Sequence, residues 1–285
     1  MTNIRIAVQK SGRLHEESLQ ILQDCGISVD NGKDQLKAFS RNFPLEVFYL
    51  RNGDIPQYLR DGVVDLAIIG ENVLIEKGVD IPIALRLGFS KCRVSLAIPK
   101  DRPYQEIKDM EGMRIATSYP NTVKQYFEKL GMQPDIHLIN GSVEIAPNIG
   151  LADAICDIVS SGSTLFKNNL KEVAVMLNSE AVLAVSPEIS SERRVLLEKL
   201  QFRMAAVLKG RSAKYILMNV PNEKIDQIID ILPGMRSPTV LPLAAPGWSS
   251  LHTVIEKNSF WEVIDSLKAN GAEGLLVVPI EKMVL

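Results

Sequence analysis

Short apolar runs alternate with helix-like stretches over residues 1–180, and this alternation limits the chain to a few folds. We expect strands at residues 4–8, 47–50, 66–69, 94–98, 115–117, 136–139, 154–159 and 173–177. Strands that alternate with helices are typical of α/β proteins, so we expect a mostly parallel sheet.

Helix start and stop signals lie between these runs. We expect helices at residues 14–25, 55–61, 120–127 and 191–209, the last of them ended by Gly210. Asp54 is placed to N-cap the second helix, and Ser142 to begin a further one.

The number of strands is high for one sheet, which predicts more than one domain. Residues 93–179 form a second α/β unit in this interpretation, and the apolar run at 181–185 brings the chain back to the first. We therefore expect lobe I from residues 1–92 and 180–208, lobe II from residues 93–179, and a separate domain from residues 211–285. Ligands of open α/β sheets bind beyond the carboxyl ends of strands, so the expected site is a cleft between the lobes.

Residues 211–285 have a different rhythm. Expected strands at 215–220, 239–243, 251–255 and 274–278 and helices at 223–231 and 260–269 follow the order βαββαβ. This order is the ferredoxin-like plan, which suits a small C-terminal domain. No internal repeat is apparent in the sequence.

Composition excludes several classes of protein. The chain has 32 basic and 34 acidic residues, which argues against a nucleic-acid-binding protein. No apolar run approaches the roughly 18–20 residues of a membrane helix, and no secretory leader is visible. Cys25, Cys92 and Cys156 are far apart, which predicts free thiols and a cytoplasmic protein without a membrane partner. The three histidines are also scattered, so we expect no metal site built by the protein alone.

The most informative segment is an apolar strand that runs into a loop of small hydroxyl residues. This loop consists of Ser160, Ser161, Gly162, Ser163 and Thr164. Its hydroxyls and backbone N–H groups favour an anion, and a phosphate is the natural ligand. Asp153 and Asp157 share a strand face but lie about 13 Å apart, so Asp157 is the better candidate for hydroxyls beside the phosphate. The alternative is a plain polar turn, and the pattern alone favours neither.

Cations follow two other strands. Lys10, Ser11, Gly12 and Arg13 lie between the first strand and the first helix, and Arg51 ends the strand at 47–50. A lysine point charge and an arginine fork suit a polyphosphate. The alternatives are a solvated basic turn and a surface arginine.

Two more strand ends carry polar residues. Gly70 and Glu71 follow the strand at 66–69, and Thr117, Ser118 and Tyr119 follow the strand at 115–117. Each could also be a simple helix start. Because no nucleophilic triad or Rossmann motif accompanies them, the pattern predicts binding of phosphorylated ligands and catalysis by positioning and charge stabilisation.

Six segments, in order, resemble the long form of the ATP phosphoribosyltransferase family. They are residues 9–14, 62–74 (GVVDLAIIGENVL), 114–120 (RIATSYP), 140–147 (NGSVEIAP), 150–165 and 279–283 (PIEKM). The resemblance covers the whole chain. It implies a two-lobed body like that of periplasmic binding proteins and a C-terminal ferredoxin-like, ACT-like regulatory domain.

The resemblance also implies the reaction. Adenine N1 of ATP attacks the anomeric carbon of phosphoribosyl pyrophosphate with inversion, giving N1-(5-phospho-β-D-ribosyl)-ATP and pyrophosphate. This is the first step of histidine biosynthesis. The family uses Mg²⁺, assembles as dimers and hexamers, and is inhibited by histidine bound to the third domain.

The candidate site residues fall into three groups. Lys10, Arg13 and Arg51 are the candidates for stabilising charge. The candidates for holding the substrates are Ser11, Gly12, Gly70, Glu71, Thr117, Ser118, Tyr119, Glu144, Asp153, Asp157 and the five loop residues 160–164. The candidates for holding histidine are Met235, Ser237, Thr239 and Ala272. Some relatives have an acidic residue where this chain has Asn219.

Two other interpretations remain at this point. One is a non-catalytic two-lobed binding protein, which predicts a secretory leader and leaves the loop at 160–164 unexplained. The other is a catalytically silent regulatory subunit fused to an amino-acid-sensing domain. Turnover of ATP and phosphoribosyl pyrophosphate separates the three.

Overall fold

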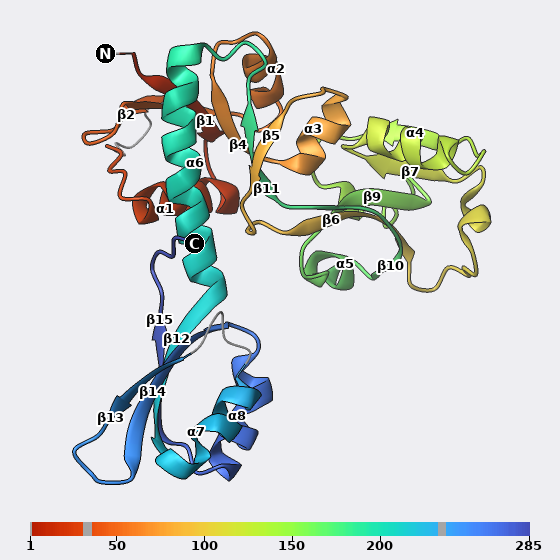
Figure 1. Ribbon diagram of the computed structural model, residues 1–285. Coiled ribbons are helices and arrows are strands. Elements are labelled where there is room, and N and C mark those ends of the chain that lie inside the picture. The colour runs from red at the N-terminus through yellow and green to blue at the C-terminus, as the bar shows by residue number, and fades with distance from the viewer. Residues whose placement is uncertain (1, 31–35, 233–237) are drawn as a thin grey trace. The chain divides into compact units, whose positions relative to one another are not determined.

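The computed structural model describes residues 2–30, 36–232 and 238–285. The chain divides into two compact units, Met1–Glu198 and Lys199–Leu285. The first unit contains two sheets, which belong to lobe I and lobe II, and the second contains one sheet (Figure 1). The expected α/β class, with a two-sheet body and a separate C-terminal sheet, is confirmed.

Lobe I is built on a six-stranded sheet. Its strand order is β2 (Lys37–Phe39), β3 (Leu45–Leu50), β1 (Ile4–Gln9), β4 (Leu66–Gly70), β11 (Ala181–Val185) and β5 (Ile83–Arg86). β1 pairs in parallel with β3 and β4, but β2, β11 and β5 pair antiparallel. The expectation of a mostly parallel sheet is therefore wrong, because β11 enters from lobe II and not through a crossover helix on the same sheet.

Lobe II is built on a five-stranded mixed sheet. Its strand order is β10 (Leu170–Ser179), β6 (Cys92–Pro99), β9 (Ala154–Val159), β7 (Arg114–Thr117) and β8 (Asp135–Leu138). β7 pairs in parallel with β8 and β9, whereas β6 is antiparallel to β9 and β10. The carboxyl ends of β7 and β9 thus lie at one edge, where a ligand of an α/β sheet is expected.

Helices connect the strands of both lobes. They are α1 (Arg13–Asp24), α2 (Ile55–Arg60), α3 (Glu71–Lys77), α4 (Pro120–Glu128) and α5 (Ser163–Lys167), with 3₁₀ turns η1 (Ile107–Met110) and η2 (Val143–Ile145). Asp54 does precede α2, but its side chain makes no capping hydrogen bond. Ser142 precedes only the three-residue turn η2, so the longer helix expected there does not form. Its left-handed backbone (φ +50°) differs from the extended backbone that is usual at a helix N-cap.

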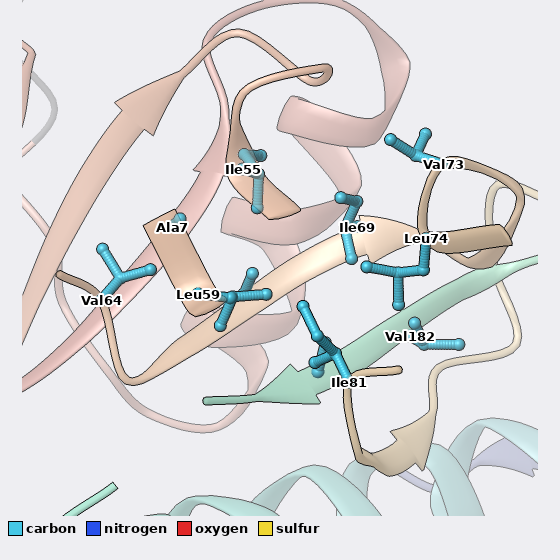
Figure 2. Close-up of a cluster of buried hydrophobic side chains, with 11 residues drawn as sticks. Ala7, Ile55, Leu59, Val64, Ile69, Val73, Leu74, Ile81 and Val182 are labelled. Atoms are coloured by element: carbon cyan, nitrogen blue, oxygen red, sulfur yellow. The ribbon is translucent and has the colours of Figure 1, made fainter. Parts of the chain in front are cut away.

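One face of the lobe I sheet is covered by α2 and α3. Figure 2 shows Ala7 of β1 and Ile69 of β4 packed with Leu59 of α2 and Leu74 of α3, all buried. Val182 of β11 joins the same cluster. Each fully buried Leu or Ile contributes about 1.5–3 kcal/mol, so this cluster fixes α3 on the sheet before any polar contact is counted.

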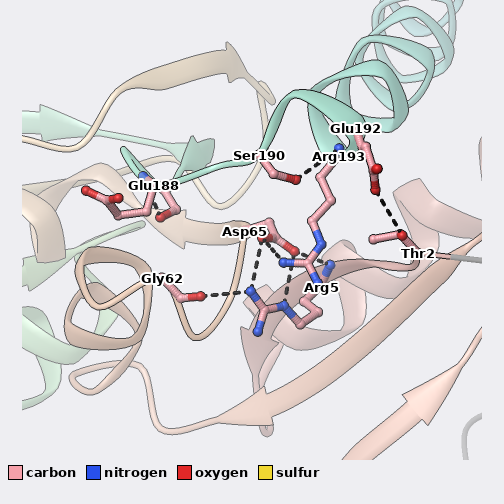
Figure 3. A network of polar contacts seen from close by, with 9 residues as sticks. Thr2, Arg5, Gly62, Asp65, Glu188, Ser190, Glu192 and Arg193 are labelled. Carbon is pink, nitrogen blue, oxygen red and sulfur yellow. Dashed lines mark hydrogen bonds and ion pairs between the residues drawn. The ribbon is translucent and has the colours of Figure 1, made fainter.

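An ion-pair motif is repeated in the two lobes. At the amino end of β4, Asp65 accepts hydrogen bonds from the backbone N–H and Nε of Arg5, and Arg5 Nη2 donates to Gly62 O (Figure 3). At the amino end of β9, Asp153 accepts the same two bonds from Arg114. Arg114 Nη1 donates to Gly150 O, which is three residues before Asp153 just as Gly62 is before Asp65. The two lobes thus share a local arrangement of an arginine, an aspartate and a glycine carbonyl.

The second unit has the expected βαββαβ order. Its sheet runs β13 (Thr239–Pro242), β14 (Trp248–Glu256), β12 (Ala213–Pro221) and β15 (Glu273–Pro279), and every pair is antiparallel. The 3₁₀ turn η3 (Asn222–Lys224), α7 (Ile225–Ile231) and α8 (Phe260–Ala269) complete the domain. The ferredoxin-like expectation is confirmed for this domain.

The helix α6 (Ser191–Ser212) continues past Gly210, so the predicted end at Gly210 is wrong. A Cβ at position 210 would lie 2.9 Å from backbone atoms of Ile280 and Glu281. Close by, the N–H of Met283 donates to the carbonyl of Ala206 (2.8 Å). Gly210 is therefore required by the close approach of the C-terminal segment and does not terminate the helix.

No helix in the described part of the chain is long and apolar enough to cross a membrane.

Candidate active site

A pocket of about 160 Å³ lies at the carboxyl end of β9 in lobe II. It is lined by Glu144 from η2, by Asp157 from β9, and by residues 158–165, which include the whole loop from Ser160 to Thr164. The structure thus brings together seven of the predicted site residues: Glu144, Asp157, Ser160, Ser161, Gly162, Ser163 and Thr164. They come from three separate elements of the lobe.

The loop keeps its hydroxyls at the surface. Gly162 has φ +80°, a left-handed conformation that favours glycine, and it turns the chain into α5. Ser161 Oγ donates to Ser163 Oγ (3.1 Å) and accepts from the N–H of Ser163 (3.4 Å). Leu165 is buried and anchors the start of α5. The exposed hydroxyls can therefore be redirected to a ligand without breaking a bond to the core.

Arg93 holds the beginning of this loop and is not among the residues predicted from the sequence. Arg93 Nη1 donates to the carbonyl of Ser160 (3.1 Å), while its Nε and Nη2 bind the carboxylate of Glu172 (2.6 and 2.7 Å). An arginine at the start of an otherwise apolar strand was the available signal. Arg93 is a support for the loop and not a lining residue of the pocket.

Asp157 is a half-buried carboxyl with a perturbed pKa. Burial raises its pKa above the ordinary value of 3.8, and the nearby Glu144 charge acts in the same direction. The N–H of Ile158, which donates to Oδ1 at 2.7 Å, opposes this effect. A carboxylate that is short of hydrogen-bond donors is a good acceptor for ligand hydroxyls.

The segment 117–119 follows β7, the strand next to β9. Thr117 is fully buried and accepts a hydrogen bond from the N–H of Tyr119 (2.8 Å), and Ser118 Oγ donates to Ile139 O (2.6 Å). Both hydroxyls therefore serve the fold. Burial, above all, raises the pKa of Tyr119, and the Asp157 charge acts in the same direction. Because Thr117 of β7 is opposite Cys156 of β9, Tyr119 follows β7 at the same sheet edge as Asp157.

Asp153 is not brought to this pocket. It precedes β9, at the strand end opposite to the loop, and its carboxylate accepts bonds from Arg114 and an ion pair from Arg102 (3.2 Å). Hydrogen bonds from Arg114, above all, lower its pKa to about 2. A carboxylate committed to two arginines serves the fold, so the structure gives the predicted substrate contact of Asp153 no support.

The predicted cationic residues lie at the carboxyl ends of β1 and β3. The N–H of Lys10 donates to Leu50 O (2.8 Å), which places Lys10 next to Arg51. Both side chains are exposed. Ser11 and Gly12 form the turn into α1, and Gly12 has φ +89°.

Arg13 begins α1 and pairs with Glu17 (3.2 Å). Its positive charge also lowers the pKa of Cys92, although burial, the larger effect, leaves that pKa raised. Arg13 therefore lies within electrostatic range of Cys92, the first residue of β6.

Gly70 and Glu71 lie at the carboxyl end of β4, beside β1. A Cβ on Gly70 would lie 2.5 Å from Asn72 Oδ1, so a side chain there would displace the Asn72 amide from its bond with Ser179. The Glu71 carboxylate is already bound by Arg86 through two hydrogen bonds (2.6 and 2.7 Å). Glu71 therefore contributes a neutralised ion pair to this edge of the sheet.

Of the predicted histidine-site residues, Met235 and Ser237 lie outside the described residues. Thr239 is on β13 and is opposite His252 of β14, whereas Ala272 directly precedes β15 and is buried. β13 and β15 are the two edge strands, about 14 Å apart at roughly 4.8 Å per strand. Thr239 and Ala272 of one chain are thus too far apart to contact one small ligand.

No group of three or more His, Cys, Asp and Glu side chains within residues 2–30, 36–232 and 238–285 could hold a metal ion. The two carboxylates at the pocket are Glu144 and Asp157. Mg²⁺ in phosphoryl-substrate sites is typically held by one or two carboxylates together with substrate phosphates. The donors present fit a Mg²⁺ ion that arrives with the substrate.

Comparison with known proteins shows similarity to one enzyme family along almost the whole chain. The sequence pattern of the ATP phosphoribosyltransferase family matches residues 51–206, and that of its C-terminal domain matches residues 210–282. The ATP phosphoribosyltransferase of Phocaeicola vulgatus is 54% identical over 282 residues, covering 99% of this chain and 100% of that protein. The one from Cytophaga hutchinsonii is 52% identical over 283 residues, covering 99% of each.

A solved structure extends the comparison to the fold. The ATP phosphoribosyl transferase (HisG:HisZ) complex from Thermotoga maritima contains a chain that is 32% identical, with a TM-score of 0.61. The match covers 71% of this chain and 98% of that chain. With two family patterns in order, relatives at half identity over the full length, and a pocket that joins a carboxylate to a hydroxyl-rich loop, this chain belongs to the ATP phosphoribosyltransferase family, a family of pentosyltransferases of histidine biosynthesis.

Proposed function

We propose that this chain condenses ATP with phosphoribosyl pyrophosphate to give N1-(5-phospho-β-D-ribosyl)-ATP and pyrophosphate. The observation that carries the proposal is the lobe II pocket, in which Asp157 lies directly beside the loop from Ser160 to Thr164. This arrangement suits a ribose 5-phosphate: the loop hydroxyls and N–H groups receive the phosphate, and Asp157, with Glu144 beside it, receives the ribose hydroxyls.

The chemistry fits a site without a strong base. Adenine N1 carries an unprotonated lone pair at neutral pH, so the barrier comes from charge that develops on the departing pyrophosphate and on the ribose. Lys10, Arg13 and Arg51 are the cations at the carboxyl edge of the lobe I sheet, and we assign them to the phosphates of the two substrates. Mg²⁺, when bound with the substrate, supplies further charge neutralisation.

Tyr119 is our candidate for a contact with the nucleotide. It follows β7, which ends at the same sheet edge as β9, the strand that carries Asp157. Thr117 and Ser118 then act through the backbone of this segment, because their hydroxyls are bonded within the lobe. Gly70 shapes the opposite edge in lobe I.

We also propose that histidine inhibits the reaction by binding to the C-terminal domain of an oligomer. The opposite edge positions of Thr239 and Ala272 support a pocket shared by two copies, in which one copy supplies β13 and the other the residues before β15. Homodimers that assemble further into hexamers would provide such contacts. The three cysteines are free in this structure, which suits action in the reducing cytoplasm.

Pyrophosphate release measured with ATP, phosphoribosyl pyrophosphate and Mg²⁺ tests the proposal. We expect release that requires both substrates and that slows in millimolar histidine. Folded protein that binds either substrate but never releases pyrophosphate would instead be a binding protein or a silent subunit. Thr239→Ala should weaken inhibition by histidine and leave the uninhibited rate unchanged.

A further inference from the structure

Four buried polar side chains lie where α3 of lobe I meets lobe II. Asn72 and Glu76 come from α3, Thr122 from α4, and Ser179 from the end of β10, and each is at most 8% exposed. Buried polar groups are tolerated when they are hydrogen-bonded, and these four find their partners across the junction of the lobes. The junction is therefore specific in its geometry and not merely apolar.

Glu76 makes most of these contacts. Its Oε1 accepts from the N–H of Asn121 (3.0 Å), and its Oε2 accepts from the N–H (2.9 Å) and Oγ1 (2.7 Å) of Thr122. Asn121 Nδ2 returns a bond to the backbone carbonyl of Glu76 (2.9 Å). A single side chain of lobe I thus accepts the N–H groups of two consecutive residues at the α4 amino terminus.

The α4 helix depends on this contact. Its N-cap residue, Tyr119, makes no side-chain capping bond, so Glu76 supplies the acceptors that the first N–H groups of α4 need. A carboxylate there also complements the positive end of the helix. The cap of a lobe II helix is therefore provided by lobe I.

A second contact fixes the other end of α3. The N–H of Asn72 donates to Ser179 Oγ (3.0 Å), and Ser179 Oγ donates to Asn72 Oδ1 (2.9 Å). Because α3 is also anchored in the lobe I core through Leu74, it is a rigid element that reaches lobe II at two points. The α4 terminus is held in one position relative to the lobe I sheet.

The held segment leads directly into the site. Ser118 and Tyr119 join β7 to α4. Thr117, the last residue of β7, is opposite Cys156 of β9, so Tyr119 follows β7 at the same sheet edge as Asp157. Any shift of the α4 terminus would move Tyr119 and the edge where the nucleotide is assigned. The loop from Ser160 to Thr164, in contrast, is held by contacts within lobe II, such as the bond from Arg93 to Ser160.

We propose that Glu76 is a positioning residue for the reaction: by capping α4 across the junction, it aligns Tyr119 and the lobe II pocket with the cations of lobe I. This inference rests on the proposed function. Under this proposal, loss of the Glu76 cap lowers the rate of reaction but not the affinity for phosphoribosyl pyrophosphate. The reason is that this substrate is assigned to lobe II alone, whereas the reaction needs the two lobes in the correct relative position.

The test compares Glu76→Gln with wild type in the full-length chain. A misalignment of about 1 Å costs up to 100-fold in rate, so we expect kcat to fall roughly 10- to 100-fold. Calorimetric titration with phosphoribosyl pyrophosphate should keep a stoichiometry near that of wild type and a Kd within about threefold. Thr122→Ala removes the Oγ1 donor, one of the three that bind the Glu76 carboxylate, and should lower kcat by a smaller factor.

Asp109→Asn is the matched control. Asp109 also accepts backbone N–H groups, from Gln105 (2.6 Å) and Glu106 (3.1 Å), but entirely within lobe II. Its kcat should equal that of wild type. A Glu76→Gln enzyme with a wild-type kcat, or one whose kcat falls only in proportion to binding stoichiometry, would overturn the proposal.

Amide hydrogen exchange separates this inference from the proposed function. In Glu76→Gln, the N–H groups of Asn121 and Thr122 should exchange faster than in wild type, whether or not the wild type turns over. Absence of wild-type turnover would refute the proposed function. Unchanged exchange at these two amides would overturn the role of Glu76 independently.

Discussion

Arg5 binds Asp65 through three hydrogen bonds, from its backbone N–H (2.8 Å), Nε (3.2 Å) and Nη2 (3.2 Å). Arg193 of α6 adds a fourth at 3.0 Å, so one carboxylate that is only 3% exposed joins the first strand to the start of α6 (Figure 3). The pair lies at the amino ends of β1 and β4, away from the sheet edge that carries Lys10 and Arg51. It stabilises lobe I without taking part in the proposed chemistry.

Asp65→Ala should be strongly destabilising. Removal of the carboxylate leaves two partly buried arginines without their partner, which costs about 3–5 kcal/mol. Urea denaturation of the full chain measures the change. Asp30→Ala, which breaks an exposed ion pair with Arg41, is the control and should cost less than about 1 kcal/mol. Equal effects of the two substitutions would contradict a structural role for Asp65.

Asp153 predicts a pH dependence of stability. Its pKa is lowered to about 2 from an ordinary value of 3.8, chiefly by Arg114. The stabilisation is therefore present above pH 3.8 and is lost as the pH falls through 2; it amounts to about 2 kcal/mol. The difference in unfolding free energy between wild type and Asp153→Asn should shrink over this range. A difference that does not change with pH would contradict the ion-pair assignment.

Gly210→Ala tests the packing of the C-terminal segment. Alanine favours a helix by about 1 kcal/mol over glycine, so substitution at an open helical position stabilises. Here the new Cβ would meet backbone atoms at 2.9 Å, and we expect a net loss of about 1–3 kcal/mol. Thermal unfolding measures it. Gly53→Ala, with no neighbour within 4 Å, should change little. A stabilised Gly210→Ala protein would show that the segment does not pack there.

Asp157 predicts a pH dependence of binding. The carboxylate form accepts the ribose hydroxyls, and burial raises its pKa above 3.8. Affinity for phosphoribosyl pyrophosphate should therefore be lost as the pH falls through this raised pKa, earlier than for an exposed aspartate. Calorimetric titration of the Asp157→Asn variant should give an affinity that is weaker and lacks this acidic limb. Identical acidic limbs in both proteins would assign the titration to another group.

Local patterns in the sequence predict most of the elements and few of the long-range contacts. The strand at 154–159 follows from a mostly apolar run, and the helix at 260–269 follows from a mixed apolar and charged stretch that stops before Gly271; both end where predicted. β2 has only three residues and β5 only four, and both lie at the edges of the lobe I sheet, so their apolar runs are short. Their absence from the predictions has this simple cause.

In the candidate site, too, contacts between residues that are close in sequence could be predicted, and contacts between distant residues could not. The loop from Ser160 to Thr164 and Asp157 are close in sequence, and a strand that ends in a hydroxyl loop predicts their proximity. The roles of Asp153 and Gly210 depend on residues 39 or more positions away, which local patterns do not indicate. The cap on α4 is similar, since Glu76 and Thr122 are 46 positions apart.

The most direct test of the central claim is pyrophosphate release by Asp157→Asn with ATP, phosphoribosyl pyrophosphate and Mg²⁺, measured beside wild type and Asp109→Asn. Two charge-assisted hydrogen bonds at about 1.5 kcal/mol each correspond to roughly 100-fold, the fall that we predict in kcat/KM for phosphoribosyl pyrophosphate. Wild type and Asp109→Asn should turn over at the same rate. An Asp157→Asn enzyme with wild-type kinetics would contradict the assignment of the lobe II pocket to the phosphoribosyl substrate.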